Sequence, residues 1–275
     1  MLTTLLLALA LIGQTKSDPD QFPLALHRSM EIDDLDREIQ RLHDTVLLKR
    51  AQLVSTKRLS QRGLVSRADL ERESASLRYE EAHEAESTAY RNLKIYERDV
   101  MGRVISADEV KAYSLLLDWV KKQATMAQVD LDFRDYTLKQ TRVLFQRKAI
   151  SRQELDDAEQ AFNTAQASLA LSKSREAQIV MELAARRGEK SYDSVEYQRL
   201  KGSYLKARIQ YFEVVTAGSK SQLTIAQQRS ARGLIATEDV ALFQRAVDDA
   251  EAALAAERKK LEENESDPVQ PATTN

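Results

Sequence analysis

The chain has 275 residues, of which 41 are Lys or Arg and 43 are Asp or Glu, so its formal net charge is −2. A near-neutral charge argues against a nucleic-acid partner, and the absence of cysteine excludes disulfides, thiolate metal sites and cysteine nucleophiles. The chain contains only 7 glycines and 4 prolines, and the prolines (Pro19, Pro23, Pro268 and Pro271) all lie near its two ends. Because sheets and enzyme loops need turn residues, this composition predicts an almost entirely helical chain.

The first residues include a short apolar segment. Leu5 to Ile12 is an unbroken apolar run, but it is far shorter than the ~20 residues that a membrane-spanning helix needs. It is typical of the apolar core of a secretory signal peptide, with Gly13-Gln14-Thr15 as a cleavage region. We therefore predict a signal peptide over 1–17, a linker over 18–29, and export to the periplasm or cell envelope. A short interfacial anchor is the alternative.

One motif of ten residues occurs three times at a spacing of 85 residues. It lies at 61–70 (QRGLVSRADL), 146–155 (QRKAISRQEL) and 231–240 (ARGLIATEDV). Apolar positions after the second motif also map onto the third copy at the same offset, as Ala165 does onto Ala250. The chain is therefore predicted to consist of three copies of one structural unit.

Each unit is predicted to be a hairpin of two long helices. The segment before each motif carries apolar residues at alternating steps of three and four, which is the pattern of a coiled-coil helix. The predicted fold class is all-α: an elongated antiparallel coiled-coil bundle of three repeated helical hairpins over 30–262, without a β domain, followed by a disordered tail over 263–275. The six expected helices are 30–62, 67–98, 107–147, 152–187, 194–230 and 237–262.

The connections between helices carry residues that end one helix and begin the next. Gly63 and Gly233 can adopt the left-handed conformation that closes a helix C-terminus. Ser66 and Ser151 can cap the following helix, and an acidic residue lies three positions later in each case, as in a capping box. The two linking turns contain similar combinations, which are Gly102 before Ser106-x-x-Glu109 and Gly188 before Asp193-x-x-Glu196.

The motif turns resemble those of two families of envelope proteins. Arg62-Gly63-Leu64-Val65-Ser66 and Arg232-Gly233-Leu234-Ile235-Ala236 resemble the hairpin turns of TolC-type outer-membrane efflux factors. The second copy, from Leu144 to Ala158, resembles the coiled-coil tip of HlyD-type periplasmic adaptors, in which a Leu seven residues before a Ser belongs to the docking tip. Leu59 with Ser66 and Leu144 with Ser151 keep this spacing. The linking turns are too short to insert barrel strands, so the resemblance implies a relative made of hairpins alone.

The resemblance implies a periplasmic helical-hairpin component of an efflux or type I secretion-like envelope assembly that docks through its hairpin turns. Its partners would be an efflux adaptor or an outer-membrane factor, or a second copy through coiled-coil self-association. The alternative function is a structural coiled-coil spacer or scaffold of the envelope, in which the apolar pair of each turn closes its own hairpin as a hydrophobic staple. The candidate partner-binding residues are Leu59, Gly63, Leu64, Val65, Ser66, Leu144, Ala149, Ile150, Ser151, Gly233, Leu234 and Ile235.

The residues form no recognisable catalytic constellation. Three histidines are too few for most catalytic or metal clusters, and the seven glycines are isolated rather than grouped in a phosphate-binding loop. Glu80-x-x-His83 matches the spacing of di-iron helical bundles, but the required second pair is missing, because Gln40 precedes His43. We therefore predict no enzymatic activity, no cofactor and no metal. The arginines around the first two motifs either face an acidic partner or complement the helix dipoles; they are Arg58, Arg62, Arg67, Arg142, Arg147 and Arg152.

Overall fold

The computed structural model describes residues 31–191 and 195–266, and these residues form six helices without a β-strand. The helices are α2 (Ile32–Gln61), α3 (Arg67–Met101), α4 (Glu109–Gln146), α5 (Arg152–Arg186), α6 (Val195–Ala231) and α7 (Thr237–Ser266). The described chain divides into two compact units, with the boundary between Tyr197 and Gln198. The first unit holds α2 to α5, and the second holds α7 and all but the first residues of α6. The predicted signal peptide and linker lie outside the described residues.

The all-α fold class is confirmed, and the predicted helices agree with the observed ones to within four residues at each end. The largest difference is at the end of α7, which runs to Ser266, although the sequence placed 263–266 in the tail. A proline disfavours helical backbone chiefly at the residue before it, so Pro268 permits the helix to continue this far. The rest of the predicted tail, 267–275, lies outside the described residues.

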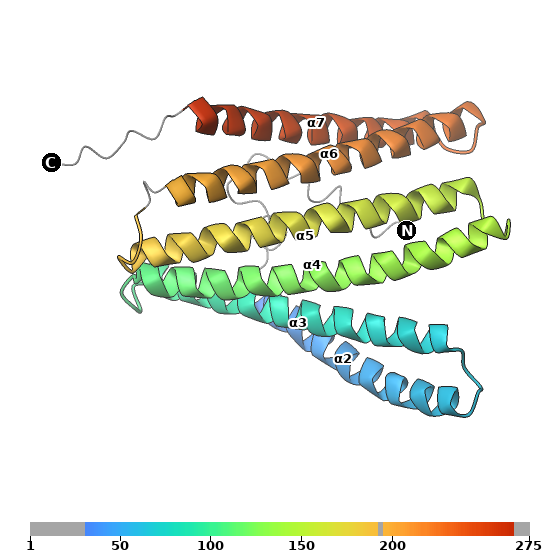
Figure 1. Ribbon diagram of the computed structural model, residues 1–275, viewed down its shortest axis with the longest axis horizontal. Coiled ribbons are helices and arrows are strands. Elements are labelled where there is room, and N and C mark those ends of the chain that lie inside the picture. Colours follow the sequence, from blue (N-terminus) through green and yellow to red (C-terminus); the bar gives the residue numbers. More distant parts are fainter. Residues whose placement is uncertain (1–30, 192–194, 267–275) are drawn as a thin grey trace. The chain divides into compact units, whose positions relative to one another are not determined.

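In the first unit the four helices lie side by side in the order α2, α3, α4, α5, each antiparallel to the next (Figure 1). Ion pairs between α2 and α3 show that these helices are antiparallel, because Asp36 pairs with Arg91 whereas Arg50, further along α2, pairs with Glu81. The α2–α3 turn and the α4–α5 turn therefore lie at one end of this unit, and the α3–α4 turn lies at the other (Figure 1).

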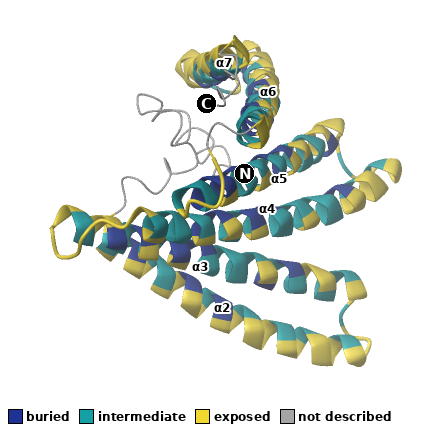
Figure 2. Cartoon of the chain, turned by 60° about the vertical axis from the view of Figure 1, so that its left-hand side comes forward, coloured by how far each residue is buried: buried dark blue, intermediate teal, exposed yellow. Residues whose placement is uncertain are grey.

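The apolar core of this unit thins along α2 toward the α2–α3 turn. α2 buries Leu35, Leu42 and Val46 but no residue after Val46. Figure 2 shows exposed surface dominating the part of α2 near the turn. There the seam holds Lys49, whose Nζ lies 2.9 Å from Oε1 of Glu80. Polar contacts thus hold together the part of this hairpin that has little core.

The single tryptophan is a large, fully buried side chain between α3 and α4. Trp119 is 1% exposed and packs against Tyr90, with ring centroids 5.2 Å apart and ring planes tilted by 46°. Its Nε1–H donates to Oε1 of Glu86 at 2.6 Å, and this carboxylate is itself buried. An aromatic pair of this kind contributes ~0.5–1.5 kcal/mol beyond the burial of its area. The cluster therefore fixes how α3 and α4 lie against each other.

The second unit contains the hairpin of α6 and α7. The two helices are antiparallel, because Lys220 pairs with Glu251 whereas Lys206, nearer the start of α6, pairs with Glu265. Arg208 Nη2 lies 2.8 Å from Glu257 Oε1, and both side chains are at most 2% exposed. Breaking such a buried pair leaves an uncompensated charge. The pair therefore resists any slip in the register of this hairpin.

Candidate docking surface at the helix turns

The turn between α2 and α3 stops one helix and starts the next with local hydrogen bonds. Gly63 has φ +71°, and the N–H of Leu64 donates to the carbonyl of Leu59 at 3.0 Å, which is the Schellman arrangement. Oγ of Ser66 then accepts the N–H of Asp69 at 3.1 Å and caps α3. A Cβ at Gly63 would meet no atom within 4 Å. The glycine is therefore favoured by the backbone conformation and not by lack of space.

The turn between α4 and α5 repeats this geometry with a lysine in place of the glycine. Lys148 has φ +57°, and the N–H of Ala149 donates to the carbonyl of Leu144 at 2.9 Å. Ser151 forms a full capping box: its Oγ accepts the N–H of Glu154 at 3.2 Å, and its own N–H donates to Oε2 of Glu154 at 2.7 Å. The bond from this backbone N–H, followed by the bond from the hydroxyl, holds the pKa of Glu154 below its usual value.

The turn between α6 and α7 has the same helix stop without the side-chain cap. Gly233 has φ +69°, and the N–H of Leu234 donates to the carbonyl of Arg229 at 2.9 Å. Ala236 stands where the other two turns have serine, and its carbonyl accepts the N–H of Asp239 at 3.2 Å. The three motif turns thus share one backbone geometry, as the repeat predicts, and differ in how the next helix is capped.

The linking turn between α3 and α4 differs from the prediction at its left-handed position. Arg103 takes the left-handed conformation with φ +58°, whereas Gly102 has φ −75° and remains in helical geometry. In the other linking turn Gly188 has φ +72°, so its left-handed conformation is confirmed. Asp193, the predicted cap that follows it, lies outside the described residues.

The predicted Ser106 cap of α4 is wrong, because the helix begins at Glu109 and is capped by Asp108. The carboxylate of Asp108 accepts the N–H of Lys111 at 3.0 Å. The hydroxyl of Tyr96, on α3, accepts the N–H of Asp108 and donates to its carbonyl, both at 2.8 Å. A side chain on the preceding helix thus decides where α4 starts, which the local sequence pattern does not show.

Each motif turn presents one apolar residue to solvent and turns the next one inward. The inward residue directly precedes the N-cap position, where a hydrophobic staple packs toward the fourth residue of the following helix. The position directly before the N-cap is the sequence feature that could have distinguished the half-buried residue of each turn from the exposed one. The exposed members are Leu64 (69%), Ala149 and Leu234 (66%), and the half-buried members are Val65, Ile150 and Ile235.

The remaining candidate residues divide by role. Leu59 and Leu144 lie in the last turn of their helices and are 37% and 42% exposed. The Schellman geometry brings each close to the residue five positions later, so Leu59 adjoins Leu64. The α2–α3 turn and the α4–α5 turn therefore carry exposed apolar surface at the same end of the α2–α5 unit. The others act in the backbone: Gly63 and Gly233 take the left-handed conformation, and Ser66 and Ser151 cap helices.

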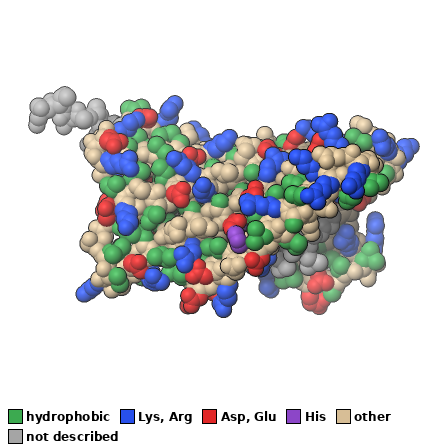
Figure 3. Space-filling view, turned by 90° about the horizontal axis from the view of Figure 1, so that it is seen from below, with side chains coloured by type: hydrophobic (Ala, Val, Ile, Leu, Met, Phe, Trp, Pro, Cys, Tyr) green, Lys and Arg blue, Asp and Glu red, His purple; other side chains and the backbone are tan. Residues whose placement is uncertain are grey.

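The same two turns are rich in positive charge. Residues 55–70 contain four Lys or Arg and one acidic residue, and so do residues 140–155, whereas residues 225–240 contain two of each. On the face shown in Figure 3, Lys and Arg side chains gather toward the right, which is the side where Figure 1 places the α2–α3 turn.

Several of these cations have no acidic partner within the described part of the chain. Arg67 pairs with Glu71, but Arg58, Arg62 and Arg147 form no ion pair with a described residue. An unpaired guanidinium beside an exposed leucine keeps its full capacity to bind a carboxylate of another molecule. The end of the α2–α5 unit thus combines exposed apolar side chains with available positive charge.

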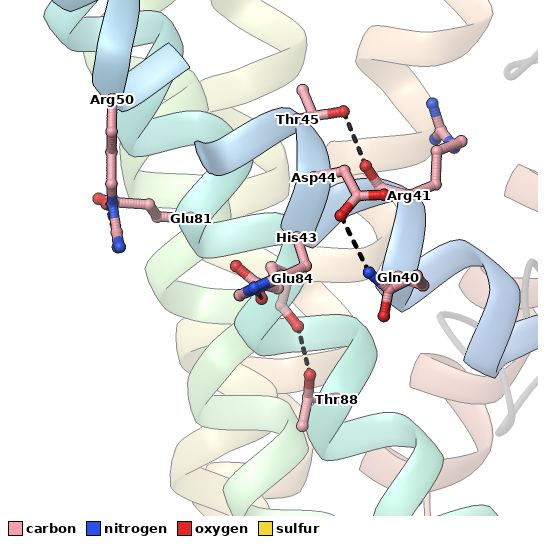
Figure 4. Close-up of polar contacts among 9 residues, drawn as sticks. All are labelled: Gln40, Arg41, His43, Asp44, Thr45, Arg50, Glu81, Glu84 and Thr88. Atoms are coloured by element: carbon pink, nitrogen blue, oxygen red, sulfur yellow. Dashed lines mark hydrogen bonds and ion pairs between the residues drawn. The ribbon is translucent and has the colours of Figure 1, made fainter. Parts of the chain in front are cut away.

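His43 takes part in a contact between two helices. Nδ1 of His43 lies 2.8 Å from Oε1 of Glu84, which joins α2 to α3 (Figure 4). Glu80, the acidic member of the Glu80-x-x-His83 pair, is bound to Lys49. In the described ranges, no group of three or more His, Asp or Glu residues is placed to hold a metal ion.

Over the described residues, no helix combines the length and the apolar character needed to cross a membrane. Comparison of the chain with protein-family models, curated protein sequences and solved structures found no match. The resemblance to TolC-type and HlyD-type turns therefore rests on the motif residues alone.

Proposed function

We propose that this chain is an exported helical-hairpin component of a cell-envelope assembly of the efflux or type I secretion kind, and that it docks through the motif turns of the α2–α5 unit. The observation that supports the proposal most is the end of this unit, where Leu64 is 69% exposed near the unpaired Arg58 and Arg62. Apolar side chains left exposed beside free cations suit a partner surface that offers apolar and acidic groups.

The geometry of the turns also favours docking on physical grounds. Both turns are closed by backbone hydrogen bonds and a serine cap, so their backbone is ordered before any partner arrives. Association then has less conformational entropy to lose than it would with a flexible loop. Closing the turn uses Val65, which leaves Leu64 available for contact.

A structural coiled-coil spacer is the second candidate. It is favoured by the half-buried Val65, Ile150 and Ile235, because staples account for these residues without any partner. It leaves unexplained why Leu64 is exposed among cations that have no described partner. This difference between the two candidates is open to experiment.

Photocrosslinking in cells that make the full chain tests the proposal. A photoreactive residue at Leu64 or Leu144 is expected to crosslink to one envelope protein. The same residue at Val180, which is 46% exposed near the opposite end of α5, is the matched control and is expected not to crosslink. Arg62→Glu should abolish the Leu64 crosslink without changing the helical circular dichroism signal.

Two results would contradict the proposal. Equal crosslinking from Leu64 and Val180 would show no preference for the turn. Absence of any adduct at the turn, with the protein present in the envelope, would favour the spacer. Recovery of the chain in the cytoplasm would remove both candidates.

A further inference from the structure

The outer face of α2 carries large apolar side chains that remain exposed. α2 is the end helix of the α2–α5 row, and its buried seam faces α3 (Figure 1). Away from this seam Leu47, Leu48 and Val54 are 50%, 60% and 52% exposed. Three large side chains exposed within two turns of one helix form a patch of the kind that marks an interaction surface.

The exposed residues follow the spacing of a second helix-pairing stripe. Leu47, Ala51 and Val54 succeed one another at steps of four and three, and the same stripe reaches Asp44 in one direction and Arg58 in the other. A heptad stripe is what one helix presents to another. The alanine at its centre leaves room for a second helix to approach closely.

The charges of α2 are divided between its two halves. Residues 31–46 contain six Asp or Glu and two Lys or Arg, whereas residues 47–62 contain five Lys or Arg and no acidic residue. The helix dipole favours this order only in the first and last turns, and Asp44 lies about three turns inside the helix. An antiparallel copy of the same helix would lay each half on the half of opposite charge.

We propose that a second copy of this chain docks on the outer face of α2, with the two α2 helices antiparallel about a two-fold axis at Ala51. Asp44 and Arg58 both lie seven residues from Ala51, which is ~10.5 Å along the helix. The axis therefore places Asp44 of each copy opposite the partner's Arg58. Leu47, Leu48 and Val54 of the two copies then cover one another between these charged ends.

The two charged residues are available for this contact. Arg58 forms no ion pair with a described residue. Asp44 accepts a hydrogen bond from Nε2 of Gln40 on its own helix at 2.9 Å, and Figure 4 shows it beside Gln40 while the adjacent His43 reaches Glu84 of α3. The interface uses a helix face and not the motif turns, and Arg58 is the one residue that it shares with the proposed docking surface.

A charge swap tests the interface in the full-length chain. Sedimentation equilibrium should show a concentration-dependent dimer. Asp44→Arg alone and Arg58→Asp alone each set like charges against each other at two symmetric places, so each should weaken dimerisation by about tenfold or more. The double variant with both changes restores opposite charges and should return dimerisation to within about threefold of the wild type.

Disulfide crosslinking through a cysteine on the two-fold axis is a second, independent test of the interface. The chain has no cysteine of its own, so Ala51→Cys can form a disulfide only with the same residue of a second copy. Under mild oxidation it should form a covalent dimer readily, whereas Arg62→Cys, at the C-cap of α2 and far from the axis, should not. A wild-type chain that stays monomeric, single charge reversals without effect, a double variant as weak as the single ones, or equal crosslinking at both cysteines would each overturn the proposal.

Discussion

The same Gly→Ala substitution is expected to have opposite effects at two positions of the α6–α7 hairpin. Gly233 has φ +69° in the turn, whereas Gly202 lies inside α6. A Cβ at Gly233 would meet no atom within 4 Å, and one at Gly202 would lie 3.7 Å from Nδ2 of Asn264, an ordinary van der Waals contact. Since steric fit opposes neither change, only the backbone conformation distinguishes them.

The magnitudes follow from that conformation. In Gly233→Ala the left-handed backbone costs ~1–2 kcal/mol for a residue with a Cβ. Alanine also restricts the unfolded chain more than glycine does, and this offsets ~0.4–1 kcal/mol of the cost. The expected net loss of unfolding free energy is therefore about 0.5–1 kcal/mol. In Gly202→Ala the alanine already prefers the helical conformation, and the expected gain is about 0.5–1 kcal/mol.

Urea unfolding followed by far-ultraviolet circular dichroism measures both changes. The midpoint should fall for Gly233→Ala and rise for Gly202→Ala, with an unchanged slope in each case. Gly63→Ala, at the equivalent position of the first motif turn, should behave like Gly233→Ala. A shift of Gly233→Ala and Gly202→Ala in the same direction would refute the left-handed geometry assigned to the motif turns.

Four further substitutions test the helix caps and the buried tryptophan. Ser151→Ala removes the cap of α5 and should lower the unfolding free energy by ~1 kcal/mol, whereas Ala236→Ser supplies a cap at α7 and should raise it by a similar amount in urea unfolding. Trp119→Phe removes the indole that donates to the buried Glu86 carboxylate and should cost ~1.5–3 kcal/mol; an unchanged urea midpoint would contradict this contact. Because the pKa of Glu154 is lower in the folded chain than its usual 4.5, its stabilising charge is fully present above that pH and is lost as the pH falls through the folded-state pKa. The stability difference between the wild type and Glu154→Gln should therefore shrink on acidification from about pH 7 to about pH 3, and a constant difference would exclude the capping box as its source.

The features that the sequence predicted well depend on local chemistry. The repeated motif placed the helix stops correctly because Gly63 and Gly233 act within one turn of chain. The caps Ser66 and Ser151 were also found, since each bonds to a residue three positions later. With so few glycines and prolines elsewhere, the chain offered few other places where a helix could end.

The features that the sequence did not predict depend on contacts between distant residues. Asp108 caps α4 because Tyr96 of the preceding helix holds its backbone, which displaces the expected cap at Ser106. Likewise, a heptad pattern shows which residues of α2 share a face, but the exposure of Leu47 and Val54 depends on which helix covers that face. The sequence therefore predicted which residues share one face of a helix, but it did not predict which face another helix covers.

The most direct test of docking through the motif turns compares two adjacent residues of one turn. A photoreactive residue is placed at Leu64, which is 69% exposed, or at Val65, which is half-buried, and the crosslinked product is quantified in cells that make the full chain. Docking predicts a strong adduct with one envelope protein from Leu64 and a much weaker one from Val65. Equal yields from the two positions, or no adduct from either, would contradict it.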